Sequence, residues 1–270
     1  MRLFNLRKEL KQVFNNNNID EADVDFIISE ILGVKRTELA LIEDISQEIE
    51  SDIRFKANLR LDNVPVDRIF GKAYFYGLEF KVSDDVLTPR PESELIIDYA
   101  INAIKDNEYK NVLDMCTGSG CLAIALKKNI DVNITAVDIS AKALQQARQN
   151  AKSNDVDIEF LRSNMFEKLE NKYDLIISNP PYIDSDEVKQ LDKEVVEHDP
   201  ILALDGGAMG LKFYNIIHDN MKKYLNDNGM LIMEIGEDQK ELILNLFADC
   251  HFVECIQDYA GLDRVMIFKK

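Results

Sequence analysis

Apolar residues over the first seventy positions recur at the spacing of a helix. They form three groups, which are Leu3, Leu6, Leu10 and Val13, then Val24, Ile27, Ile28 and Ile31, then Leu39, Leu41 and Ile42. Residues at this spacing share one helix face, so each group predicts a helix that packs on its neighbours. The pattern therefore predicts a small helical bundle over residues 1–70.

Polar residues and one glycine predict where these helices begin and end. Asp20, Thr37 and Ser46 are expected to be N-caps. Gly33 follows the second group and is expected to end its helix.

The pattern changes after residue 70. The segment KAYFYGLEFKV, residues 72–82, groups aromatic residues around Gly77, which is typical of a β-hairpin. We expect the hairpin and a linker to occupy residues 71–89 and a second domain to occupy residues 90–270.

Strand-length apolar runs then alternate with amphipathic segments. The predicted strands are NVLDM, NITAVD, VDIEFL, YDLIIS, GMLIMEI, HFVECIQ and RVMIFK, and helices are expected at GCLAIALKK, SAKALQQARQNAKSN and DQKELILNLFA. Such alternation requires crossover connections and predicts an α/β fold with a mostly parallel, doubly wound sheet. Ligands of these sheets bind at the carboxyl ends of the strands.

The charge restricts the classes of partner. The chain has 32 basic and 49 acidic residues, a net charge of −17. Proteins that bind nucleic acids gain affinity from Lys and Arg at phosphates, so we expect no direct nucleic-acid partner. The acidity is compatible with a basic protein partner, or it only keeps the protein in solution.

The N-terminal stretch and the cysteines indicate the compartment. MRLFNLRKELKQVF carries charges among its apolar positions, unlike a signal peptide, and no apolar run has membrane-spanning length. Four cysteines without a Cys-x-x-Cys motif favour a reducing compartment. We expect a cytoplasmic protein with no membrane partner. A four-thiolate zinc site from Cys116, Cys121, Cys250 and Cys255 is a weaker alternative, because the spacing is loose; we expect no metal.

Two predicted strands end in residues suited to a nucleoside. The first closes on Asp114 and enters a turn with Gly118 and Gly120, where the backbone can approach a ligand. The second ends on Asp138, where a carboxylate accepts hydrogen bonds from both ribose hydroxyls. A tight turn without a ligand is the alternative for the glycines taken alone.

S-adenosylmethionine is the ligand that best fits this pair of strand ends. CTGSGC lacks the G-x-G-x-x-G cradle of a dinucleotide site, which favours a ligand with a ribose and no pyrophosphate. Its amino acid part is expected near Asp114 and Gly118, its ribose on Asp138 and its adenine near the SNMF segment, residues 163–166.

The stretch NPPY, Asn179 to Tyr182, follows the fourth predicted strand. The Asn179 side-chain oxygen and the Pro180 carbonyl are two acceptors, held in place because proline fixes φ. Two acceptors suit an NH2 group, whose attack develops positive charge that hydrogen bonds stabilise. The Tyr182 ring is expected to lie flat against the planar acceptor group. Prolines that merely end a strand are the alternative.

Seven segments, in order, resemble the release factor glutamine methyltransferases. They are TPRPESE, LDMCTGSG, AVDIS, SNPPY, DPILALDGGAMGLKFY, LIMEIGEDQ and DYAGLDRVMIF, and they cover nearly the whole chain. NPPY alone is shared with adenine and cytosine amino-methyltransferases. The resemblance implies a seven-stranded class I methyltransferase sheet with a small N-terminal helical domain joined by a β-hairpin.

The resemblance also implies an activity. It is the transfer of a methyl group from S-adenosylmethionine to the side-chain nitrogen of the Gln in the GGQ loop of class I peptide chain release factors, leaving S-adenosylhomocysteine. The release factor is expected to dock on the N-terminal helices and the hairpin, and the enzyme is expected to be a monomer.

Functional residues carry over by position. The cofactor is expected to contact Asp114, Cys116, Thr117, Gly118, Ser119, Gly120, Asp138, Asn164, Met165 and Asn179. The Gln amide is expected to be held by Asn179, Pro180, Pro181 and Tyr182, with Asn179, Pro180 and Tyr182 as catalytic residues. Arg90 shapes the substrate site from the domain junction, or it forms a salt bridge with Glu92 or Glu94 at the start of a helix.

Three positions depart from the family pattern. Cys116 stands where Gly is usual, and a positive φ there would lower cofactor affinity. Asn164 replaces an acidic residue near the adenine, and Arg68 replaces a Tyr before the hairpin.

Two rival functions remain. A nucleic-acid amino-methyltransferase shares NPPY, but the acidic charge argues against it. A non-enzymatic partner-binding protein that retains the fold is the other, and the complete NPPY with Asp138 argues against it. His198, His218 and His251 are scattered, which disfavours metal hydrolysis and Ser-His catalysis.

Overall fold

The computed structural model describes residues 2–270, which divide into two compact units. One unit runs up to Gly71 and also contains Lys193–His198, and the other comprises Lys72–Asp192 and Asp199–Lys270. Among the described residues, no helix combines the length and apolar character needed to cross a membrane.

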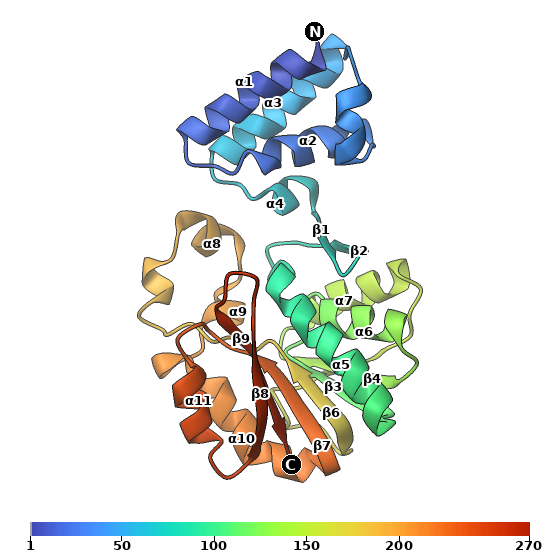
Figure 1. Cartoon of the computed structure of the whole chain (residues 1–270), viewed down its shortest axis with the longest axis vertical. Coiled ribbons are helices and arrows are strands. Elements are labelled where there is room, and N and C mark those ends of the chain that lie inside the picture. Colours follow the sequence, from blue (N-terminus) through green and yellow to red (C-terminus); the bar gives the residue numbers. More distant parts are fainter. Residues whose placement is uncertain (1) are drawn as a thin grey trace. The chain divides into compact units, whose positions relative to one another are not determined.

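The first unit is helical (Figure 1). Its elements are α1 (Leu3–Asn16), α2 (Ala22–Leu32), the 3-10 helix η1 (Arg36–Leu41), α3 (Gln47–Leu61), α4 (Val66–Phe70) and α8 (Lys193–His198). The apolar faces of α1, α2 and α3 meet around Phe14, Ile28 and Ile53, which are fully buried. The helical spacing in the sequence thus reflects one shared core.

The predicted helix limits are partly right. Ser46 accepts a hydrogen bond from Ile49 N, and Gly33 ends α2 with φ of 64°, so both predictions are confirmed. The N-cap of α2 is Glu21, one residue after Asp20, whose carboxylate accepts from Ala22 N. Thr37 lies inside η1, so that prediction is wrong; there the Glu38 carboxylate accepts the Lys35 N–H instead.

The second unit begins with a hairpin of β1 (Lys72–Phe75) and β2 (Leu78–Lys81). Tyr76 and Gly77 form its two-residue turn with φ of 50° and 73°. Positive φ at both positions matches the right-handed twist of the strands. The 3-10 helix η2 (Pro91–Ser93) then leads into α5 (Glu94–Asn107).

The sheet of this unit has seven strands, as the family resemblance implies. They are β3 (Asn111–Met115), β4 (Asn133–Asp138), β5 (Glu159–Arg162), β6 (Tyr173–Ser178), β7 (Leu225–Glu234), β8 (His251–Gln257) and β9 (Asp263–Lys269), in the order β5-β4-β3-β6-β7-β9-β8. Only the pairs that involve β9 are antiparallel among these described strands. The predicted α/β fold with a mostly parallel sheet is confirmed.

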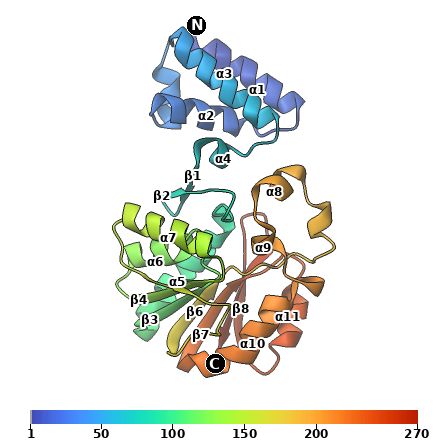
Figure 2. The same ribbon diagram turned by 180° about the vertical axis from the view of Figure 1, so that it is seen from behind.

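Helices cover both faces of the sheet (Figures 1 and 2). One face carries α5, α6 (Cys121–Asn129) and α7 (Ala141–Ser153), and the other carries α10 (Lys212–Tyr224) and α11 (Lys240–Leu246). Side chains of neighbouring residues in one strand pack into different cores: Val112 belongs to the core on one face of the sheet and Leu113 to the core on the other face. Burial on both sides explains why the strands are continuous apolar runs.

Three elements differ from the sequence prediction. Strand β7 begins at Leu225, before the predicted start at Gly229. Strand β5 begins at Glu159 rather than Val156, because Val156 N bonds to Ala151 O and completes the end of α7. Helix α10 was not predicted. Four short helices lie between β6 and α10 in the chain, namely η3 (Val188–Gln190), α8, α9 (Ile201–Leu204) and η4 (Ala208–Gly210).

Candidate active site

A cavity of about 340 Å³ lies in the second unit at the carboxyl ends of the central strands. The strand order reverses between β3 and β6, and such a switch point is the usual ligand site of a doubly wound sheet. Of the predicted site residues, those lining the cavity are Cys116, Gly118, Asp138, Asn164, Met165, Asn179 and Pro181. The other predicted residues do not line it, namely Arg90, Asp114, Thr117, Ser119, Gly120, Pro180 and Tyr182.

The turn after β3 is held by its own hydrogen bonds and by β4. Cys116, Gly118 and Gly120 have φ of 63°, 53° and 83°. Thr117 N donates to Val137 O at 2.9 Å, and Gly120 N donates to Thr117 O at 2.8 Å. A Cβ at Gly120 would meet Ala147 Cβ at 3.0 Å, so this glycine lets α6 pack against α7.

The backbone at Cys116 has the positive φ that would lower cofactor affinity. Its positive φ is the conformation that glycine adopts readily and a side chain does not. Its Sγ lies 3.7 Å from Met165 Sδ on the cavity wall, and Met165 also has positive φ, 47°. Burial raises the pKa of the Cys116 thiol well above its ordinary value, so the sulfur stays neutral and unreactive.

Asp138 is fixed at the cavity wall. Its two oxygens accept from Gly118 N at 2.9 Å and from Ser140 N at 2.8 Å. Burial raises the pKa of this carboxyl, and the two backbone donors partly offset the effect. A carboxylate held in this way remains able to accept hydrogen bonds from a ligand on its other lone pairs.

Asp114 lies fully buried beneath the turn. Its Oδ2 accepts from Thr117 Oγ1 at 2.6 Å, whereas its Oδ1 has no hydrogen-bond partner among the described residues. Burial raises the pKa of this carboxyl to about 7. A buried acceptor without a partner is costly, and a cationic ligand nearby would reduce that cost.

Asn164 carries no charge, yet a carboxylate stands beside it. Its Nδ2 donates to Glu167 Oε1 at 2.6 Å. Arg68, the third departure from the family pattern, lies in α4 of the first unit.

The NPPY stretch begins where β6 ends. Ser178 Oγ donates to Met115 O at 2.9 Å and ties the end of β6 to β3. Asn179 Nδ2 donates to Ser93 Oγ at 3.0 Å, while Pro180 and Pro181 are buried. The Tyr182 hydroxyl donates to Glu234 Oε1 at 3.3 Å. Burial raises the pKa of Tyr182, so its hydroxyl stays protonated.

Two glycines of the ALDGGAMG segment lie so close to the backbone of NPPY that no larger side chain fits there. A Cβ at Gly206 would lie 2.8 Å from Tyr182 Cα, and one at Gly210 would lie 1.9 Å from Tyr182 O. Ile183 N also donates to Leu204 O at 3.0 Å, and Gly206 N donates to Ile183 O at 2.8 Å. The segment therefore supports the backbone of NPPY from behind.

Arg90 pairs with Asp199 rather than with the acidic residues at the start of the next helix. The distance from its Nη2 to Asp199 Oδ2 is 2.8 Å, and the Asp199 side chain is only 6% exposed. Asp199 directly precedes Pro200, which lines the cavity. The ion pair thus joins the segment before α5 to the cavity wall.

Sequence reasoning missed Ser93 and Glu234. Both are buried, and both contact the side chains of NPPY. The signal for Glu234 was present, because it is the one charged residue within the apolar run GMLIMEI. Ser93 lies in PESE and carried no signal of its own.

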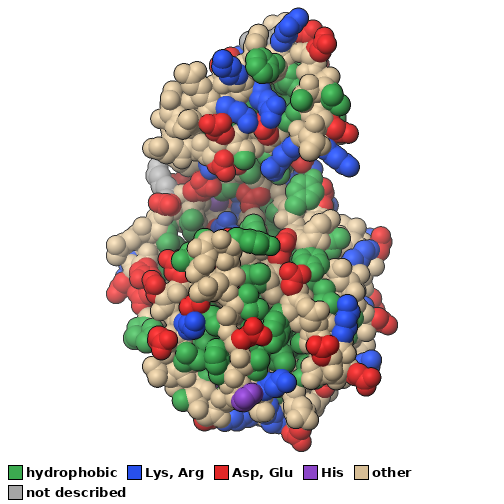
Figure 3. Space-filling view, viewed as in Figure 1, with side chains coloured by type: hydrophobic (Ala, Val, Ile, Leu, Met, Phe, Trp, Pro, Cys, Tyr) green, Lys and Arg blue, Asp and Glu red, His purple; other side chains and the backbone are tan. Residues whose placement is uncertain are grey.

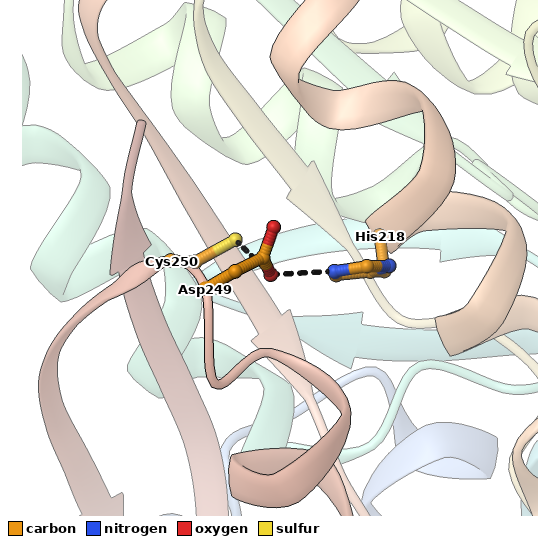
Figure 4. A group of neighbouring side chains, drawn as sticks. All are labelled: His218, Asp249 and Cys250. Carbon is orange, nitrogen blue, oxygen red and sulfur yellow. Dashed lines mark hydrogen bonds and ion pairs between the residues drawn. The ribbon is translucent and has the colours of Figure 1, made fainter.

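One group of possible metal ligands was found among the described residues, namely His218, Asp249 and Cys250 (Figure 4). It does not line the cavity. Asp249 already pairs with Lys222 and with His218 Nε2, the latter at 2.8 Å. The four cysteines form no such group in residues 2–270, and Cys121 packs on the opposite face of the sheet from the other three.

Solved structures show the same fold. A methyltransferase from Pyrococcus furiosus matches with a TM-score of 0.54 and 19% identity, covering 72% of this chain and 89% of that chain. The hMettl16 catalytic domain matches with a TM-score of 0.57 and 16% identity, covering 79% and 81%. Residues 97–211 match the model of the methyltransferase small domain. The fold and the matched domain place the chain among the class I methyltransferases.

Sequence relatives narrow the class to one family. A release factor glutamine methyltransferase of Thermodesulfovibrio yellowstonii is 34% identical, covering 97% of both chains. Those of Agrobacterium fabrum and Bacillus subtilis are each 36% identical, covering 92% and 87% of this chain and 90% and 86% of theirs. The chain belongs to the release factor glutamine methyltransferase family.

Proposed function

We propose that this protein transfers a methyl group from S-adenosylmethionine to the side-chain amide nitrogen of the Gln in the GGQ loop of class I peptide chain release factors. The observation that carries the proposal is Asn179, which begins NPPY at the end of β6 and lines the cavity beside Cys116 and Asp138. Membership of the family supports the same acceptor.

The residues of the cavity fit S-adenosylmethionine. Asp138 presents a fixed carboxylate for ribose hydroxyls, and Cys116 and Gly118 bring backbone to the wall. Val137, Ile139 and Met165 give an apolar lining suited to adenine. Asp114 lies beneath the turn and not on the cavity wall, and its Oδ1 without a partner favours a positive charge of the ligand's amino acid part nearby.

The chain contributes positioning and hydrogen-bond acceptors. When bound, the cofactor supplies an electrophilic methyl group. Asn179 Oδ1 and the Pro180 carbonyl accept hydrogen bonds from the amide NH2, which stabilises the positive charge that develops on its nitrogen. Positioning makes the displacement effectively unimolecular, and the proton lost afterwards passes to water or a carbonyl. The products are the methylated Gln and S-adenosylhomocysteine.

We further propose a division of labour along the chain. Residues 1–70 and the hairpin and linker, residues 71–89, bind the release factor, and residues 90–270 carry out the transfer. Exposed apolar side chains support this assignment, namely Phe4, Leu41 and Phe55 in the helical unit and Tyr74 in the hairpin. Such side chains commonly serve as anchors at interfaces.

The charge distribution favours a protein acceptor over nucleic acid. The net charge is −17, and acidic side chains are spread over the larger unit among basic and apolar ones on the face shown in Figure 3. This surface lacks the excess of Lys and Arg that nucleic-acid binding requires.

Methyl transfer from labelled S-adenosylmethionine tests the proposal. Three acceptors are compared: a purified class I release factor, the same factor with its GGQ Gln replaced by Ala, and nucleic acid. We expect label on the intact factor alone. Label on nucleic acid alone would support an amino-methyltransferase of nucleic acids instead. Cofactor binding without any transfer would support a binding protein that has lost its activity.

A further inference from the structure

Four side chains, of which Ser93 and Glu234 are buried, form a hydrogen-bonded chain next to the proposed acceptor site. Asn179 Nδ2 donates to Ser93 Oγ at 3.0 Å, Ser93 Oγ donates to Glu234 Oε2 at 2.5 Å, and the Tyr182 hydroxyl donates to Glu234 Oε1 at 3.3 Å. One carboxylate thus connects, directly or through Ser93, to both the first and the last residue of NPPY. We name these four residues the amide-anchoring chain.

The direction of these hydrogen bonds follows from the chemistry of Glu234. An ionised carboxylate only accepts, so the Ser93 and Tyr182 hydroxyls must donate to it. The proton of Ser93 is then committed, and its oxygen can only accept from Asn179. Asn179 must therefore turn its NH2 group toward Ser93. Its Oδ1 is left without a hydrogen bond from any described residue and is free to accept from a ligand.

Ser93 does not act as a capping residue. It occupies the N-cap position of α5, where a Ser side chain usually accepts a backbone N–H of the first turn, yet its side chain makes no such bond. The hydroxyl is 3.0 Å from Asn179 and 2.5 Å from Glu234 instead. Helix α5 therefore has no side-chain cap, and the Ser93 hydroxyl bonds to Asn179 and Glu234 instead.

We infer that Ser93 and Glu234 are positioning residues that fix which face of the Asn179 amide points at the substrate. This inference rests on the proposed function, because it assigns the orientation of Asn179 in that reaction. With Oδ1 toward the cavity, Asn179 accepts from an NH2 group. A reversed amide would present donors to the donors of the Gln side chain and would repel it.

Protonation of Glu234 should weaken the preference for one orientation of the Asn179 amide. Burial raises the pKa of Glu234 to about 7, with Glu92 raising it further and Arg264, Ser93 and Tyr182 lowering it. The backbone O of Glu234 accepts from Tyr214, which remains protonated throughout. Once protonated, Glu234 can donate to Ser93, and the Ser93 proton can then turn to Asn179 Oδ1. The correct orientation is thus favoured above about pH 7.

Substitutions at Ser93 test the inference with a matched pair. Ser93→Ala removes the hydroxyl, and Ser93→Thr keeps it. We expect kcat for release factor methylation to fall about tenfold or more in Ser93→Ala, because the acceptor loses its orientation. The Thr variant should retain most of the wild-type kcat. The dissociation constant for S-adenosylmethionine, measured by calorimetry, should change little in either variant, since Ser93 does not line the cavity.

The pH profile of kcat adds a readout that a purely structural role would not affect. Wild-type kcat should fall as pH drops below about 7, and this fall should be absent in Glu234→Gln, which cannot titrate. If the wild type methylates no release factor, the proposed function fails. If the wild type is active and Ser93→Ala keeps its kcat, or the fall below pH 7 persists in Glu234→Gln, the positioning role fails.

Discussion

At the scale of single residues, Cys116 is the position where this chain departs most clearly from an unstrained cofactor turn. Its φ of 63° places Cβ in a region that costs a non-glycine residue about 1 kcal/mol. The side chain also stands on the cavity wall against Met165. The turn therefore forms with a conformational free-energy cost at Cys116 that a glycine would not have.

Replacing Cys116 by Gly should tighten binding of S-adenosylmethionine by about threefold to tenfold. The reason is that removing the side chain from the cavity wall lets the backbone of the turn approach the ligand more closely. Calorimetric titration measures the effect. Cys116→Ala is the matched control, because it removes the sulfur and keeps the strained Cβ, and it should not improve binding. Weaker binding by the Gly variant would show that the thiol itself supports the ligand.

Sequence reasoning at this scale found the residues that line the cavity but not those behind them. Asp138 and Asn179 follow buried strands, and their position at strand ends was readable from alternation alone. Ser93 is brought to Asn179 across 86 positions of the chain. Such a contact depends on how α5 packs against the sheet, which no local pattern encodes.

At the scale of elements, the segment between β6 and α10 supports NPPY through glycines. Gly210 has φ of 67°, and a Cβ there would lie 1.9 Å from Tyr182 O and 2.4 Å from Gln239 Nε2. Backbone at Tyr182 cannot move away without displacing NPPY. The small residues of this segment are thus a packing requirement of the site.

Gly210→Ala should lower methyl transfer at least about tenfold and reduce the free energy of unfolding by about 2 kcal/mol or more. Kinetic assays and denaturant unfolding measure the two effects. Gly261→Ala is the control, because Gly261 has a similar φ, 81°, with nothing within 4 Å of the added Cβ. Equal losses in both variants would mean that strain at positive φ, and not the collision with Tyr182, is responsible.

A pH-sensitive contact joins His218, in the middle of α10, to Asp249, which lies between α11 and β8. Hydrogen bonding to Asp249 raises the pKa of His218 above its ordinary value of 6.5. A raised pKa means that the folded state binds the proton more tightly. The stabilisation is therefore complete below pH 6.5 and is lost as pH rises through the folded-state pKa.

His218→Gln should consequently destabilise the protein at about pH 6 more than at about pH 9. Denaturant unfolding of both proteins at the two pH values gives the difference. The variant Asp249→Asn removes the partner and should abolish the pH dependence in the same way. A difference between wild type and variant that stays constant with pH would exclude this ion pair as its source.

Most elements with a strong period were predicted, α10 being an exception, and a short 3-10 helix was not placed correctly. Strand β4 was predicted with its observed limits because it is an apolar run buried on both faces. Thr37 was wrongly taken as an N-cap, since a short 3-10 helix gives no period to place its start. Helix α10 was missed although its signal was present, because Tyr214, Ile217, Met221 and Tyr224 recur at helical spacing and are buried.

At the scale of the whole molecule, exposed apolar residues outside the cavity offer a test of partner docking. Phe55 in the helical unit is 59% exposed, and Tyr74 in the hairpin is 51% exposed. Phe55→Ser and Tyr74→Ser should each raise the KM for the release factor about threefold or more and leave kcat and cofactor affinity unchanged. Leu242→Ser on α11, also exposed, is the control and should have no effect. Unchanged KM in both variants would argue against docking on these residues.

The overall architecture was the most predictable feature, because the alternation of strands and helices extends over most of the second unit. The change of period near the hairpin predicts a domain boundary there, and the two compact units divide between Gly71 and Lys72. The inclusion of Lys193–His198 in the helical unit was not predictable, because it depends on contacts such as that between Arg60 and Glu194, 3.0 Å apart. Long-range ion pairs of this kind leave no pattern in the local sequence.

The most direct test of the account is to identify the methylated atom. A class I release factor is incubated with S-adenosylmethionine and either the wild-type protein or Asn179→Ala, and the GGQ peptide is analysed by fragmentation mass spectrometry. We predict one added methyl group on the Gln side-chain nitrogen with the wild type, and a rate about a hundredfold lower with Asn179→Ala although the cofactor still binds. Methylation at another residue, or near-normal turnover by Asn179→Ala, would contradict the role assigned to NPPY.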